Sequence, residues 1–111
     1  MKFETIKAIY KAPGKEPILI EVENELHAFQ NAVGGYLEAV TFTTDCCILC
    51  DEEGRLKGLP YNITILGCHF VGPILIVGVE REDFCDVPNR ISLTSKGLEF
   101  TKKGNADEIE L

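Results

Sequence analysis

The residues best suited to chemistry are thiols and one imidazole near the middle of the chain. Cys47 and Cys50 have the C-x-x-C spacing used by zinc sites and by thiol–disulfide enzymes. Cys46, Cys68 and His69 are further candidate ligands. A structural zinc ion requires four such ligands that converge as a tetrahedron. The chemistry therefore depends on whether the elements carrying these residues can bring them together.

The element that carries Cys47 and Cys50 does not favour convergence. Residues 45–51 are typical of a β-strand, in which residues three apart point to opposite faces. Cys68 and His69 are adjacent and diverge for the same reason. A thioredoxin-type pair also needs a helix N-terminus to lower the thiol pKa, and no helix is predicted after Cys50. We expect no metal and no cofactor, and we expect reduced cysteines that pack as small apolar side chains.

No other pattern predicts catalysis. The only histidines are His27 and His69, and no serine or cysteine has a partner at motif spacing. We expect the acidic side chains to be solvated charges on loops and strand faces, because no sequence pattern places two carboxylates together. We expect a protein that is not an enzyme.

The clearest local pattern is the double glycine Gly34-Gly35, which ends a predicted helix. Asn24 is the expected N-cap of this helix. Gly34 suits the position after the last helical residue, because glycine enters the left-handed region without a Cβ clash, and Gly35 lets the chain reverse. A phosphate-binding loop is the alternative, but such glycines precede a helix, where the dipole is positive. Gly34-Gly35 follows the helix, so we predict a structural turn.

Four residues are candidates for binding a ligand or a partner. The amide of Asn62, which follows a proline-containing turn, could bond to nearby backbone, as such residues commonly do. It could equally be presented to a ligand beside Tyr61. The double-glycine turn directs Tyr36 and Glu38 into a strand, so these two could contribute to the same surface.

The remaining pattern predicts a single α+β domain at residues 1–104 and a frayed acidic tail at 105–111. We predict a mostly antiparallel sheet of about five to seven strands with a β-β-α-β opening and one short packed helix. The opening resembles a β-grasp start, although the later strands could instead wrap into a small barrel. The helical face expected to pack on the sheet consists of Leu26, Phe29 and Val33.

The strands are predicted from β-branched, aromatic and alternating residues. One of them, Ile74–Val79, is apolar on both faces, which is typical of a central strand covered on both sides. Residues 52–54 are expected to form a tight hairpin turn into Arg55–Lys57, and residues 80–89 a loop. The other predicted strands are Phe3–Lys11, Ile18–Glu23, Tyr36–Thr43, Asp45–Asp51, Ile63–Val71 and Ile91–Leu93.

Charge and hydropathy exclude several classes of partner. The formal net charge is -7, and the basic residues form no stripe, which disfavours nucleic-acid binding. No apolar run approaches the roughly 20 residues that span a bilayer. The N-terminus lacks the apolar region of a secretory signal, so we expect a cytoplasmic protein without membrane contact.

Three groups of residues, taken in order, resemble the landmarks of an uncharacterised protein family, one defined by a domain of unknown function. Its members are small proteins of phages, plasmids and integrative elements, mainly of Gram-positive bacteria. The resemblance covers roughly residues 6–95. The landmarks are Val33–Glu38 preceded by Gln30, Asp51–Gly54 with Gly58–Asn62, and Gly72–Gly78.

The chain departs from this pattern at two positions. In the family an asparagine often stands where this chain has Asp51, and a basic residue often follows the asparagine matched by Asn62, where this chain has Ile63. The family has no established activity, so no residue role carries over. The resemblance implies an accessory protein of a mobile element.

Two functions from different classes are consistent with these observations. The first is a non-enzymatic accessory or regulatory protein that binds a protein partner. The second is a protein that binds a small molecule at a site near Tyr36, Tyr61 and Asn62. A nucleotide is one candidate ligand. A deep pocket would favour the second, and an exposed sheet edge or a flat apolar patch would favour the first.

Overall fold

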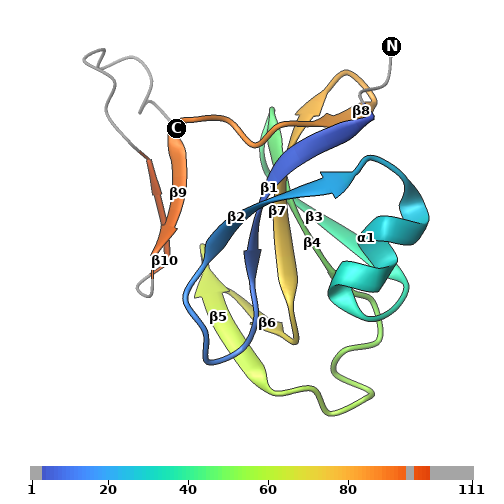
Figure 1. Cartoon of the computed structure of the whole chain (residues 1–111). Helices are drawn as coiled ribbons and strands as arrows, with labels where there is room; N and C mark the ends of the chain where they lie inside the picture. The colour runs from blue at the N-terminus through green and yellow to red at the C-terminus, as the bar shows by residue number, and fades with distance from the viewer. Residues whose placement is uncertain (1–3, 95–96, 101–111) are drawn as a thin grey trace.

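The computed structural model describes residues 4–94 and 97–100, which form one helix and ten strands (Figure 1). The predicted tail and the predicted domain end at residue 104 lie outside these residues. The elements in chain order are β1 (Thr5–Lys11), β2 (Ile18–Glu23), α1 (Leu26–Val33), β3 (Leu37–Thr43), β4 (Cys46–Asp51), β5 (Tyr61–Ile65), β6 (Cys68–Val71), β7 (Ile74–Glu80), β8 (Asp83–Cys85), β9 (Ile91–Thr94) and β10 (Gly97–Phe100).

Six of the described strands form one open sheet in the order β2-β1-β7-β4-β3, with β8 paired to the end of β7. Every pair in this sheet is antiparallel. The predicted α+β class, the mostly antiparallel sheet and the β-β-α-β opening are therefore confirmed. Because β2 and β3 are its two edges, the sheet does not close into a barrel. The hairpins β5–β6 and β9–β10 are separate two-stranded sheets.

The two central strands carry the core. Every residue of β4 is buried, and Ile74, Leu75, Ile76 and Val77 of β7 are each 0% exposed, as predicted for a strand covered on both sides. Side chains alternate between the faces of a strand, so one set packs under α1 and the other under the two hairpins. Figure 1 shows α1 on one side of the sheet and the hairpins on the other.

The helix crosses from one edge strand to the other and covers one face of the sheet. Phe29 and Val33 are buried, and the Phe29 ring contacts the Phe84 ring edge-on at 5.4 Å between centroids. Leu26, on the same stripe, is 59% exposed, so burial of the stripe begins at Phe29. A helix of eight residues depends on this packing, because isolated helices of that length are marginal in water.

The predicted N-cap is wrong. Glu25 occupies the capping position in an extended conformation and makes no side-chain capping bond. Asn24 Nδ2 instead donates a hydrogen bond to the Phe84 carbonyl at 3.0 Å. This bond spans a long sequence separation, so no local pattern could have indicated it.

Three local predictions are also corrected. Residues 55–57 do not begin a strand, because the chain stays in turns from residue 52 to residue 58. The segment 63–71 is a hairpin and not one extended stretch, since it reverses at Leu66 and Gly67, whose φ values are 50° and 83°. The predicted loop at 80–89 contains β8, while the short strand at Ile91–Leu93 is present as β9.

The C-terminal end of α1 is formed as predicted. Gly34 has φ 89°, and the amides of Gly34 and Gly35 both donate to the Gln30 carbonyl, at 2.8 and 3.1 Å.

Replacing Gly34 with valine should lower the free energy of unfolding by about 1–2 kcal/mol, because an L side chain is strained in the left-handed region. Urea denaturation measures this. Gly34→Asn is the control and should lose less, because asparagine tolerates this region better; a valine variant as stable as the wild type would contradict the capping role.

Candidate functional site

The structure does not gather the four candidate binding residues at one place. Tyr36 is 65% exposed and lines a cleft at the C-terminal end of α1. Glu38 lines a different cleft, between β3 and the β5–β6 hairpin. Tyr61 is 58% exposed on that hairpin, and Asn62, its neighbour, is buried.

Asn62 serves the fold. Its Nδ2 donates to the carbonyls of Lys11 and Gly72, at 2.8 and 2.7 Å, and its Oδ1 accepts from Lys11 Nζ at 2.7 Å. These bonds use both amide N–H groups and join β1, β5 and the turn before β7. Lys11 and Gly72 are distant from Asn62 in the sequence. The Asn62 amide therefore bonds to backbone, as expected, but not to the backbone of its own turn. Ile63, where the resemblance indicates a basic residue, is 4% exposed in the core.

A chain of hydrogen bonds on the same hairpin was not anticipated. Tyr61 Oη and Thr64 Oγ1 are 2.7 Å apart, and Thr64 Oγ1 lies 2.6 Å from His69 Nδ1. Thr64 and His69 are cross-strand partners in the β5–β6 register. The turn at Leu66 and Gly67 creates this pairing, which one extended segment from 63 to 71 would not contain.

The Asp51 carboxylate is a second buried polar group, and its side chain is 1% exposed. It accepts a 2.7 Å bond from Lys57 Nζ and a 2.9 Å bond from the Glu53 amide. A Cβ on Gly35 would lie 2.6–2.7 Å from its carboxylate atoms, so only glycine fits there. Lys57 also donates to the Gly34 carbonyl at 3.2 Å. Burial raises the pKa of Asp51, but the bonds from Lys57 and the Glu53 amide outweigh it and hold the pKa below its ordinary value.

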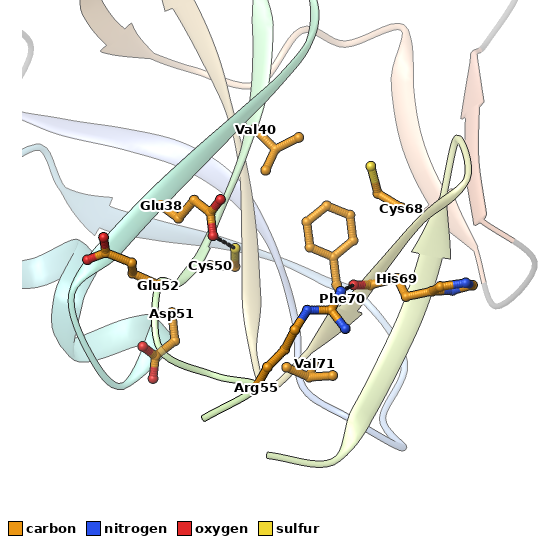
Figure 2. A pocket seen from close by; sticks show the side chains of 10 residues that line it. All are labelled: Glu38, Val40, Cys50, Asp51, Glu52, Arg55, Cys68, His69, Phe70 and Val71. Atoms are coloured by element: carbon orange, nitrogen blue, oxygen red, sulfur yellow. Dashed lines mark hydrogen bonds between the residues drawn. The ribbon is translucent and has the colours of Figure 1, made fainter. Parts of the chain in front are cut away.

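The cleft that contains Glu38 has a volume of about 260 Å³, and we name it the Glu38–Arg55 cleft (Figure 2). Arg55 reaches it from the loop after β4 and donates a 2.6 Å bond to the His69 carbonyl. Figure 2 shows the His69 ring pointing away from the cleft, so His69 contributes mainly backbone. The lining residues are Glu38, Val40, Cys50, Asp51, Glu52, Arg55, Cys68, His69, Phe70 and Val71.

Cys50 and Cys68 both line this cleft, and Cys50 is the buried one of the two. Burial, and then the charges of Glu38 and Asp51, raise the pKa of Cys50 to about 11. Cys50 Sγ lies 4.0 Å from Glu38 Oε1, where a protonated thiol can donate weakly to the carboxylate. The arrangement offers the Glu38 carboxylate, the Arg55 guanidinium and apolar side chains between them, which suits binding more than covalent chemistry.

The cysteines are distributed as the strand prediction requires. Cys46 and Cys50 pack under the hairpins, whereas Cys47 packs under α1, so the C-x-x-C pair points to opposite faces. Burial raises the pKa of Cys46 to about 12 and that of Cys47 to about 11. Within residues 4–94 and 97–100, no three or more His, Cys, Asp or Glu side chains converge as a metal site.

Two further clefts lie elsewhere on the described part of the chain. The cleft at the end of α1, of about 360 Å³, is lined by Tyr36, the two glycines and Lys57, among others. A third, of about 340 Å³, lies between β1, β2 and the segment after β8 and includes Leu19 and Asp86. No helix in the described part of the chain is long and apolar enough to cross a membrane.

Comparison with known proteins identifies the family. The family described as Domain of unknown function (DUF3846) matches residues 6–99. The chain belongs to this family. No curated protein and no solved structure matches the chain. The match to DUF3846 contains all three landmarks, and the Asn62–Gly72 bond and the close approach of Asp51 to Gly35 show that landmark residues hold one another in place.

The pH dependence of stability tests the Asp51 contacts in this DUF3846 domain. Because the folded pKa of Asp51 is lowered, its stabilising contribution is complete above the unfolded pKa of about 3.9 and is lost as pH falls through the folded value. Asp51→Asn should lower the melting temperature at pH 7 by about 4–8 °C, the effect of losing roughly one charge-assisted bond. The difference from the wild type should shrink below about pH 4.

Thermal melts from pH 7 to pH 2 provide the measurement. Glu16→Gln, which removes an exposed carboxylate, is the matched control and should leave the profile unchanged. An Asp51→Asn variant whose deficit stays constant over this range would contradict the assignment of the pH-dependent contribution to Asp51.

Proposed function

We propose that this protein is a non-enzymatic accessory protein of a mobile genetic element that acts in the cytoplasm by binding a protein partner. The mobile-element context rests on the family resemblance. The absence of disulfides among the five cysteines is consistent with a reducing compartment. The observation that carries the binding role is the open edge of β2.

The β2 edge is well suited to accept another strand. β2 pairs with β1 through six consecutive residues without irregularity, and no described strand pairs with its other side. Ile18 and Leu19 at its start are 54% and 63% exposed. A regular edge with exposed apolar side chains is a template for strand addition, in which an extended peptide bonds to the free backbone groups.

The opposite edge is less suitable. The register between β3 and β4 shifts between Thr41 and Thr43, so β3 carries a bulge or irregularity. Bulges twist an edge strand and interrupt its free hydrogen-bonding groups, which protects it from pairing. The partner is therefore expected at β2.

Charge indicates the chemistry of the partner segment. Glu21 and Glu23 of β2 are exposed, and the whole chain has a net charge of -7. A partner strand that alternates apolar residues with lysine or arginine would place opposite charges across the new pair. A second copy of this chain is disfavoured, because it would bring these carboxylates close together.

Two synthetic eight-residue peptides test this proposal, one alternating valine with lysine and the other valine with glutamate. At about 0.15 M salt, which screens unspecific charge attraction, only the lysine peptide should shift the amide NMR signals of Ile18–Glu23 and slow their hydrogen exchange. Leu19→Lys should weaken binding about tenfold or more, because it removes apolar contact and adds repulsion.

Leu56→Lys is the matched control, since Leu56 is 88% exposed on the loop after β4 and its replacement should not change binding. Both substitutions are at the surface, so stability should change by no more than about 0.5 kcal/mol. Signal changes centred on β3, or equal binding by Leu19→Lys and the wild type, would show that β2 is not the docking edge.

A further inference from the structure

The Glu38–Arg55 cleft holds two opposite charges that do not pair with each other. Glu38 lies on the wall formed by β3, and Arg55 comes from the loop after β4 (Figure 2). The ion pairs in the described part of the chain are Lys57–Asp51 and Arg90–Asp45, so neither Glu38 nor Arg55 forms one. A carboxylate and a guanidinium that share a cleft without pairing can each accept a separate charge of one ligand.

Both charged groups are partly fixed before any ligand binds. Arg55 donates one bond to the His69 carbonyl, which leaves other guanidinium N–H groups for a carboxylate. Glu38 has the protonated Cys50 thiol 4.0 Å from its Oε1. The other acids of the lining are turned elsewhere, since Asp51 is bonded to Lys57 and the Glu52 side chain points away from the cleft in Figure 2. Such positioning reduces the entropy that binding costs.

The charged side chains of the cleft also disfavour ligands that carry charge of only one sign. Glu38, which faces the cleft beside Arg55, disfavours a phosphate or a dicarboxylate. Arg55 in turn disfavours a simple amine. A zwitterion satisfies both groups at once.

The floor and the size of the cleft define the rest of the ligand. Phe70 is 5% exposed, and Val40 and Val71 are half-buried, so the surface between the charges is apolar. A volume of about 260 Å³ is at or below the lower end of ligand pockets, which suits a molecule of amino-acid size.

We propose that the Glu38–Arg55 cleft binds a free α-amino acid with an apolar side chain. Arg55 receives the ligand carboxylate, Glu38 receives its ammonium group, and the side chain lies over Val40, Phe70 and Val71. This site is on β3 and is independent of partner binding at β2, so the two proposals fail separately.

Calorimetry at pH 7 with L-leucine tests this proposal against two analogues that each lack one charge. These are 3-methylbutylamine, which has no carboxylate, and 4-methylpentanoate, which has no ammonium group. Each should bind at least about tenfold more weakly than leucine, because one charged contact is lost. Equal binding of either analogue, or no leucine binding up to about 10 mM, would overturn the proposal.

Glu38→Gln keeps the shape of the side chain and should weaken leucine binding about tenfold, whereas Arg55→Lys should retain more affinity than Arg55→Gln. Glu21→Gln, an exposed carboxylate on β2, is the matched control and should bind as the wild type does. Circular dichroism separates loss of binding from loss of fold. A folded Glu38→Gln variant with unchanged affinity would refute the assigned role of Glu38.

Discussion

The contact between the Asp51 carboxylate and the Gly35 backbone is the constraint on which the surrounding structure depends. Asp51 is the last residue of β4, and its carboxylate lies where a Gly35 side chain would be. The carboxylate is bonded to Lys57 and to the Glu53 amide. The Glu52 amide then donates to the Tyr36 carbonyl at 2.7 Å, which continues the β3–β4 pairing. The end of α1, the start of β3 and the loop after β4 are thereby fixed together.

The three landmarks form a connected frame in the structure. The Gly72 amide donates to the Pro60 carbonyl at 2.8 Å, Leu59 packs over Gly72, and Asn62 bonds to the Gly72 carbonyl. Together with the Gly35–Asp51 contact, these interactions give residues of all three landmarks a structural role. Of the two features that we propose to bind other molecules, the β2 edge lies outside this frame, whereas the Glu38–Arg55 cleft includes Glu38, the last residue of the first landmark.

Local rules were sufficient where a residue's role is set by its immediate neighbours. The period of a strand places Cys47 and Cys50 on opposite faces, and the left-handed requirement places glycine at the end of α1. Roles that depend on residues distant in the sequence could not be predicted. Asn24 bonds to Phe84, and Arg55 reaches His69, because the fold brings together segments that no sequence period relates. The Glu38–Arg55 cleft is such a juxtaposition.

A double-mutant cycle between Gly35 and Asp51 tests the central contact most directly. Urea denaturation of Gly35→Ala should show a loss of about 2–3 kcal/mol in the wild-type background, because the new Cβ would overlap the buried carboxylate. In an Asp51→Ala background the same change should cost at least about 1 kcal/mol less, since the overlapping atoms are gone. Additive losses within about 0.5 kcal/mol would contradict the account.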